Sequence, residues 1–173
     1  MAWKVEPQGS KIEFLAQHLR VTTVRGRFES FEGTLEMNEE EPEASSVAGT
    51  VDVASIKTGI PMRDSNLRGT GRFDAGRFPK MSFRSTRIEE FEGVHFQVYG
   101  DLTIKDITRP VMFDVFNKGE LPPEDGKRRW AFGARIVVNR KDFDIKWNAL
   151  FETGNVFVRD EVQGELEMLF VQE

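Results

Sequence analysis

Apolar and polar residues alternate with a period of two along most of this chain, and this alternation limits its possible folds more than any other feature. Neighbouring side chains of a β-strand point to opposite faces, so the alternation indicates strands that bury one face each. No segment has the long helical period that repeated crossovers between parallel strands require, which favours antiparallel pairing. A change of phase between Phe28 and Phe31 predicts a bulge in one strand. The pattern predicts about eight strands, at residues 10–18, 24–37, 47–53, 80–88, 95–105, 111–115, 130–138 and 162–170.

Other segments interrupt the alternation. Residues 60–68 suit a short helix, because Pro61 fits a first helical turn and Gly69 fits a left-handed stop. A second helical turn is predicted within residues 139–147, and a breaker-rich loop at residues 119–126.

Strands with one apolar face each must bury that face against a second sheet or by curling into a barrel. The 173 residues suit one domain spanning 1–173, and we predict an all-β, eight-stranded antiparallel barrel with a short helix after the third strand. Such a barrel is either filled by its own side chains or holds one slender ligand. Some positions expected to face the interior carry small residues, namely Gly49, Gly100, Ala134 and Gly164. These residues either leave room for a ligand beside the 15 Phe and 3 Trp, or they only relieve crowding where strands bend.

Composition excludes several classes of protein. No apolar run approaches the roughly 20 residues of a membrane helix, so we expect a soluble protein without stable membrane insertion. Residues 1–7 lack the features of a secretory signal, which predicts a cytoplasmic location. A net charge of -5 argues against a nucleic-acid partner. The basic cluster Lys127, Arg128 and Arg129 suits the solvated rim of a hairpin, with contact to an anion as the alternative.

Residues suited to catalysis are few. The chain has no cysteine, and its two histidines, His18 and His95, lack the spacing of metal ligands. We therefore expect no catalytic residue, metal or cofactor, although the many carboxylates leave open a hydrolase or isomerase of apolar substrates. His18 shares the inward phase, and it either reaches the interior or is a hydrogen-bonded core residue. Arg63 and Asp64 either hold a polar ligand end near the barrel mouth or tie the short helix to the barrel.

Motifs of a known family occur in order over nearly the whole chain, at residues 10–18, 26–28, 31–33, 55–58, 63–67, 73–85, 100–111, 139–143, 147–148 and 160–162. On these motifs the chain resembles the YceI-like family, also described as polyisoprenoid-binding, lipocalin-like proteins. The resemblance implies a barrel with an elongated apolar pocket, isoprenoid or other long-chain amphiphilic ligands, and often a homodimer. Gly9 and Asn66 stand where many relatives have histidine, so no role of those imidazoles can be transferred.

We therefore predict a protein that binds, and carries or stores, a long-chain isoprenoid or lipid inside the barrel. The alternatives are an enzyme acting on an apolar substrate and a stress-protective barrel without a ligand. The residues expected to contact the ligand are Phe14, His18, Phe28, Arg63, Asp64, Phe83, Gly100, Leu102, Phe113, Phe132, Ala134 and Trp147.

Overall fold

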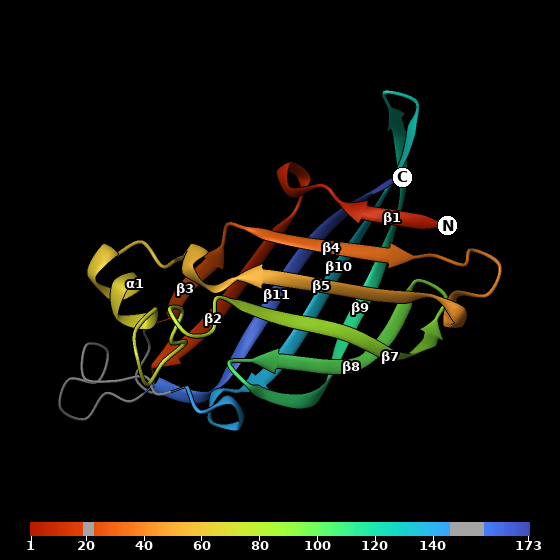
Figure 1. The fold of residues 1–173 in the computed structure, drawn as a ribbon. Coiled ribbons are helices and arrows are strands. Elements are labelled where there is room, and N and C mark those ends of the chain that lie inside the picture. The colour runs from red at the N-terminus through yellow and green to blue at the C-terminus, as the bar shows by residue number, and fades with distance from the viewer. Residues whose placement is uncertain (19–22, 146–157) are drawn as a thin grey trace.

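The computed structural model describes residues 1–18, 23–145 and 158–173, and these residues form an antiparallel β-structure with a short α-helix, α1 (Pro61–Leu67) (Figure 1). The strands are β1 (Ala2–Val5), β2 (Lys11–His18), β3 (Thr23–Phe28), β4 (Phe31–Glu36), β5 (Ser46–Asp52), β6 (Ile56–Lys57), β7 (Lys80–Glu92), β8 (His95–Ile104), β9 (Ile107–Glu124), β10 (Lys127–Asn139) and β11 (Val158–Gln172).

These strands form a closed, eight-stranded antiparallel barrel, because three pairs of consecutive strands continue each other. β1 and β2 both pair with β11 and are separated by the 3-10 turn η1 (Pro7–Gly9). β3 and β4 pair with β2 and β1, and β5 and β6 pair with β4 and β3. The ring runs β1-β4-β5-β7-β8-β9-β10-β11 and closes where β1 pairs with β11. The predicted fold is confirmed.

The bend between β3 and β4 explains the change of phase in the sequence. Every second residue of β3 is buried up to Phe28, and the alternation restarts in β4 at Phe31. Between them, the backbone N–H groups of Glu29 and Ser30 both donate to Ser55 Oγ at 3.1 Å. The phase change is therefore a bend that separates two strands, and the bulge predicted within one strand is wrong.

The hairpin of β9 and β10 is longer than the sequence predicts. β9 continues to Glu124, so the predicted loop at residues 119–126 is wrong except for its last two residues, which form the turn. Gly119 lies at a bulge and has a φ of +97°, a conformation that favours glycine. Pro122 and Pro123 lie at a second bulge, where a missing N–H donor is tolerated. The end of this hairpin projects beyond the barrel near the C-terminus (Figure 1).

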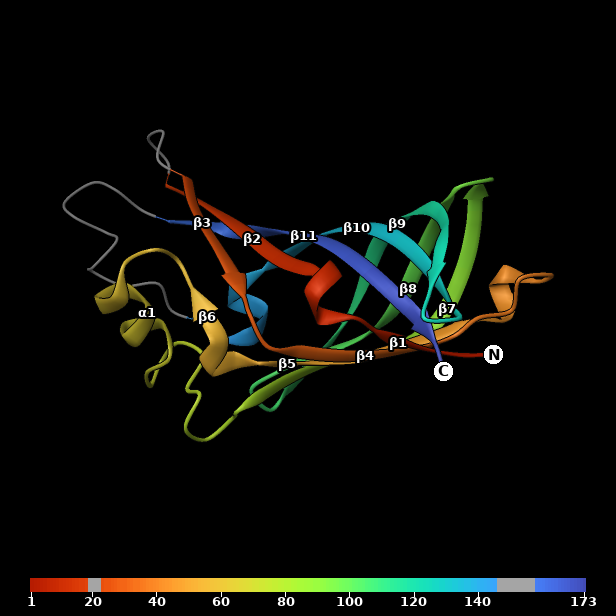
Figure 2. The same cartoon turned by 90° about the horizontal axis from the view of Figure 1, so that it is seen from above.

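The predicted short helix is confirmed as α1, with Pro61 in its first turn. The predicted left-handed stop at Gly69 is wrong, because the cap residue Arg68 is right-handed and the N–H of Gly69 donates to Asn66 O at 3.0 Å. A left-handed glycine instead precedes the helix, at Gly59 with a φ of +94°. α1 lies at one end of the elongated barrel, and both termini lie toward the other end (Figure 2).

A 3-10 turn, η4 (Arg140–Phe143), lies where the second helical turn is predicted. The rest of that predicted segment, from residue 146, lies outside the described residues. The pairing of β9 with β10 ends at Asp114 opposite Arg135, and η4 packs against both strands. Phe143 anchors the turn, since its side chain is almost fully buried.

Buried side chains form clusters toward the two ends of the barrel. The cluster next to α1 includes Phe14, Phe28, Leu67, Phe73 and Phe143. The cluster around β1 includes Trp3, Val5, Phe31, Leu35 and Phe170. A third, smaller cluster, Ile88, Phe96 and Val98, lies on β7 and β8, and Phe83 and Phe113 pack against it without being fully buried. No helix among the described residues is long and apolar enough to cross a membrane.

Candidate binding site

An elongated cavity of about 400 Å³ runs along the inside of the barrel. One end reaches Met37 and Pro42 in and near the β4–β5 connection, and the other reaches Phe73 and Phe143 near α1 and η4. Inward residues of the barrel strands line its length, and most of them are apolar. The volume falls within the roughly 300–1,000 Å³ that is typical of small-molecule sites.

The side chains along the middle of this cavity are only half-buried, although they point into the barrel. They include Phe83, Leu102, Phe113, Phe132 and Leu166. Protein interiors are close-packed and leave few voids larger than a water molecule, so the inward side chains of a filled barrel would be fully buried. The sequence is compatible with a filled barrel and with one that holds a ligand, and the structure favours the second.

Most of the residues predicted to contact a ligand line the cavity, namely Phe14, Phe28, Phe83, Leu102, Phe113, Phe132 and Ala134. The lining, as far as the chain is described, does not include Gly100, Arg63 or Asp64. His18 ends β2, but its side chain lies outside the described part of the structure, as does the whole of Trp147.

The small inward residues differ in what they do. The ring of Phe83 occupies the space beside Gly100, since a Cβ atom at this position would lie only 2.5 Å from Phe83 Cζ. A Cβ atom at Gly164 would lie 2.7 Å from Ile136 Cγ2. These glycines relieve crowding, as one interpretation of the sequence has it. Ala134, in contrast, lines the cavity and is not fully buried.

Arg63 and Asp64 form hydrogen bonds with Thr58, which precedes α1 in the chain. Asp64 is buried, and its Oδ1 accepts hydrogen bonds from the backbone N–H of Thr58, at 2.8 Å, and from the Thr58 hydroxyl. Arg63 donates to Thr58 Oγ1 and to Thr58 O, both at 2.8 Å, and burial lowers the pKa of its guanidinium. These contacts support the interpretation that the pair ties α1 to the barrel.

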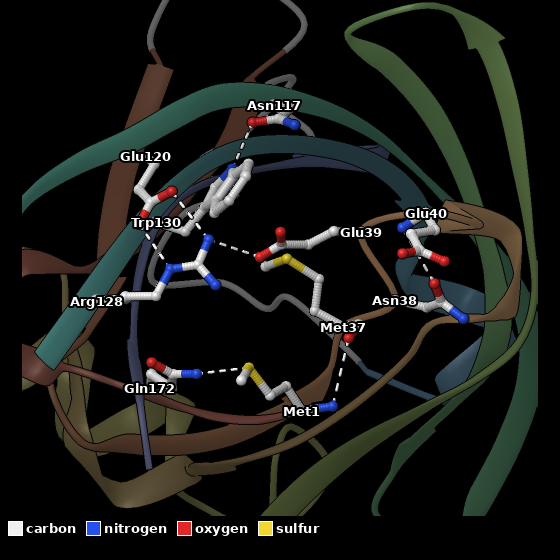
Figure 3. Close-up of polar contacts among 10 residues, drawn as sticks. All are labelled: Met1, Met37, Asn38, Glu39, Glu40, Asn117, Glu120, Arg128, Trp130 and Gln172. Atoms are coloured by element: carbon white, nitrogen blue, oxygen red, sulfur yellow. Dashed lines mark hydrogen bonds and ion pairs between the residues drawn. The ribbon is translucent and has the colours of Figure 1, made fainter.

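A polar network lies at the cavity end next to the β4–β5 connection (Figure 3). Arg128 of β10 donates from Nε and Nη2 to the two carboxylate oxygens of Glu120 in β9, at 2.7 and 2.9 Å. Its Nη2 also lies 2.7 Å from Oε1 of Glu39, which lines the cavity. The hydrogen bond from Arg128 holds the pKa of Glu120 below its ordinary value, and the bonded carboxylates raise the pKa of Arg128.

Two tryptophans flank this network. The Arg128 guanidinium lies 5.3 Å from the ring centroid of Trp3 and 5.9 Å from that of Trp130, within the range of cation–π attraction. The two indoles meet edge to face at 6.1 Å. Trp130 also donates from Nε1 to Asn117 Oδ1 at 2.6 Å, and both of these residues line the cavity. The aromatic contacts therefore help to hold Arg128 beside Glu39.

The sequence pattern does not predict this network. Arg128 is expected at a solvated hairpin rim, with an anion contact as the alternative. The anions that Arg128 contacts are carboxylates of the chain itself. The one signal in the sequence is the coincidence of a basic cluster and an acidic turn, and only barrel closure brings these two segments together.

At the opposite end of the cavity, the lining includes the charged side chain of Arg140 in η4. Its Nη1 donates to Ile145 O at 3.0 Å, and its Nη2 lies 3.5 Å from Asp160 Oδ1. Lys141 Nζ lies 3.3 Å from the other oxygen of Asp160. The basic groups of this end thus share a carboxylate.

Metal-binding groups do not gather anywhere in the described residues: no three His, Cys, Asp or Glu side chains are placed to hold an ion. The polar side chains at the network end of the cavity are bonded to one another. The chemistry that this arrangement supports is therefore the burial of an apolar chain between two polar ends.

Comparison with known proteins identifies relatives over almost the whole chain. A family model described as "YceI-like domain" matches residues 3–170. The protein YceI of Escherichia coli O157:H7 is 30% identical over 146 residues, which cover 83% of this chain and 76% of that protein.

Solved structures share the fold. BcnA of Burkholderia cenocepacia superposes with a TM-score of 0.81 and 25% identity, and covers 95% of this chain and 98% of its own. A polyisoprenoid binding domain from Saccharophagus degradans has a TM-score of 0.71 and 12% identity, with 99% and 98% covered. On the match of the family model over residues 3–170, the chain belongs to the YceI-like family.

Proposed function

We propose that this protein binds one long apolar chain, of the isoprenoid or fatty type, inside its barrel, and that it carries or stores this molecule. The observation that carries the proposal is the elongated cavity, whose inward apolar side chains are only half-buried along its middle. The Saccharophagus degradans neighbour is described as a polyisoprenoid binding domain, which supports a ligand of this class.

The energetics of such binding are favourable. Burial of about 15 carbon groups, at about 0.8 kcal/mol each, contributes on the order of 12 kcal/mol. The ordering of a flexible chain and its loss of translational freedom remove roughly half of this. The remaining free energy of about 6 kcal/mol corresponds to a Kd of tens of micromolar. A hydrogen bond at the polar end, at about 1 kcal/mol, lowers this Kd further.

Extraction of the natural ligand tests the proposal. The protein is purified without detergent, extracted with organic solvent, and the extract is analysed by mass spectrometry. We expect one class of long-chain lipid in an amount close to that of the protein. The Ala134→Trp variant, purified in parallel, reports lipid that adheres elsewhere, because its indole would occupy part of the cavity. Equal lipid in both preparations, or none in either, would contradict the proposal.

Binding without catalysis is part of the proposal, since the cavity walls are mostly apolar and acid–base catalysis needs a positioned polar group beside the reacting atoms. The hydrolase and isomerase alternatives make a different prediction. They require that the recovered lipid, or an ester of it, is converted when it is incubated with the purified protein. We expect it to be recovered unchanged, by chromatography and mass spectrometry of the incubated sample.

We also propose that the protein is a cytoplasmic homodimer. The homodimer rests on the resemblance to the family. Sedimentation of the purified protein and fractionation of the source cells measure these two properties separately. A monomer, or recovery from outside the cytoplasm, would contradict the respective part while the binding proposal stands.

A further inference from the structure

At the network end of the cavity, which we call the mouth, Glu39 lines the cavity and is joined through Arg128 to Glu120 outside the lining. This cluster of three residues has more negative than positive charge. Glu39 and Glu120 face a single guanidinium, which leaves one negative charge in excess within this cluster. Neighbouring cations are already engaged, since Arg129 lies 2.6 Å from Glu124 and the N-terminal amine lies 3.5 Å from Glu36. A ligand end at this mouth therefore meets an acidic surface.

The geometry of Arg128 explains why this residue does not serve as an anion site. Its Nε and Nη2 donate to Glu120, and Nη2 also contacts Glu39. Trp3 and Trp130 lie within cation–π distance of the guanidinium. A phosphate or carboxylate on a ligand would have to displace a chain carboxylate from charge-assisted hydrogen bonds, which are stronger than neutral ones.

Glu39 is the member of the cluster that lines the cavity. It lies in the connection between β4 and β5 and lines the cavity, together with its neighbour Asn38. Like charges brought together across an interface suppress the wrong partner. An anionic chain end beside Glu39 would experience this repulsion, whereas a hydroxyl or carbonyl would not.

We propose that Glu39 and Glu120, by occupying Arg128, make this mouth select a chain whose polar end is uncharged, such as a long-chain alcohol, over the phosphate ester of the same chain. This specificity rests on the proposed binding of an apolar chain. It assigns a role to three residues that the family resemblance does not single out. At the opposite end, Arg140 is bonded to Ile145 O and Asp160, so its positive charge is also partly neutralised.

The test compares geranylgeraniol with geranylgeranyl monophosphate, each below its aggregation concentration at neutral pH. Both compete with Nile red, an uncharged fluorophore that emits strongly in apolar surroundings. We expect wild type to bind the alcohol about tenfold or more tightly than the phosphate, on the scale of like-charge repulsion across an interface. The isosteric variants Glu39→Gln and Glu120→Gln, singly and together, should strengthen phosphate binding while alcohol binding stays constant.

Two further variants serve as controls. Glu40→Gln removes a charge from the next residue, whose side chain is not part of the described cavity lining, and it should leave the ratio of the two affinities nearly unchanged. Arg128→Gln removes the positive charge and should widen the preference for the alcohol. Because this change is opposite in sign, the test remains decisive even if the double Gln variant does not fold.

The outcomes separate this inference from the binding proposal. If wild type binds both ligands equally, or binds the phosphate more tightly, the proposed selection is wrong. The proposal that the cavity binds an apolar chain would still stand. Equal shifts in Glu40→Gln and Glu39→Gln overturn the role of Glu39. Failure of both ligands to displace Nile red from wild type overturns the binding proposal, and the selection with it.

Discussion

The side chain of Ala134 faces the cavity from β10 and has room beside it. We expect Ala134→Trp to leave the free energy of unfolding of the ligand-free protein within about 1 kcal/mol of wild type, whereas overpacking of a filled core costs about 1–3 kcal/mol. An indole that displaces about three carbons of a ligand removes about 2.4 kcal/mol of binding free energy, at about 0.8 kcal/mol per carbon group. Urea unfolding and Nile red titration measure the two quantities.

Val137→Trp is the matched control for Ala134→Trp. Val137 lies on the same strand, but it points outward and its side chain is 60% exposed. This variant should change neither the stability nor the probe affinity appreciably. Strong destabilisation by Ala134→Trp alone would mean that the interior is filled at this position.

Asp64 has a structural role that can be measured. Asp64→Ala leaves the buried N–H of Thr58 without its acceptor, and we expect the free energy of unfolding to fall by about 1–3 kcal/mol, the cost of an unsatisfied buried donor. The affinity for Nile red should stay close to that of wild type. Ser65→Ala, at an exposed position of the same helix, is the control. Weaker binding of the probe with unchanged stability would instead show that Asp64 contacts the ligand.

At the scale of single residues, the alternation in the sequence indicates to which face of a strand each side chain points. The inward phase correctly indicates that Phe83, Phe113 and Phe132 line the interior, because side-chain direction in a strand depends only on position. The pairing of Glu39 with Arg128 could not be predicted, since their distance depends on how the whole barrel closes. The contact of Arg63 with Thr58 could not be predicted either, because it depends on a tight turn into α1.

Among the elements, the hairpin of β9 and β10 depends on a glycine with a positive φ. Gly119 has a φ of +97°, and nothing lies within 4 Å of a Cβ atom placed there, so Gly119→Ala tests backbone strain without a clash. We expect it to lower the free energy of unfolding by about 1–2 kcal/mol, the cost of a left-handed non-glycine residue. Thermal or urea unfolding measures this difference.

The matching control is Gly76→Ala. A Cβ atom at Gly76 also meets nothing within 4 Å, and its φ is not positive. Its stability should stay within about 0.5 kcal/mol of wild type, as is usual for surface positions. Equal effects of the two substitutions would show that the backbone at Gly119 does not require glycine.

Prediction of the elements succeeded where alternation is long and failed where it is short. β8 runs close to its predicted length, because a half-buried strand repeats its pattern along the whole barrel wall. β1 was missed, since its four residues are too few to show a period. The end of β9 was missed because Gly119 and two prolines indicate a loop, although bulges accommodate all three in a projecting hairpin.

For the whole molecule, the incompletely filled middle of the barrel affects the stability of the ligand-free protein. The end clusters bury Trp3, Phe170, Phe28 and Phe73 and hold the barrel closed. Along the middle, the lining side chains lack contacts on one side, so dispersion energy that a filled core would gain is absent. The ligand-free barrel is therefore less stable than its occupied form by the free energy of binding that a ligand contributes.

Ligand should accordingly stabilise the protein by an amount that rises with the logarithm of its free concentration above Kd. A molecule that binds only the folded state raises the free energy of unfolding by about 2.7 kcal/mol when its free concentration is about 100 times its Kd. We expect geranylgeraniol to produce this increase in wild type, measured by urea unfolding monitored by circular dichroism. The Ala134→Trp variant should gain less at the same concentration, because its indole occupies the space that the chain needs. An equal gain in both proteins would place the ligand outside the barrel interior.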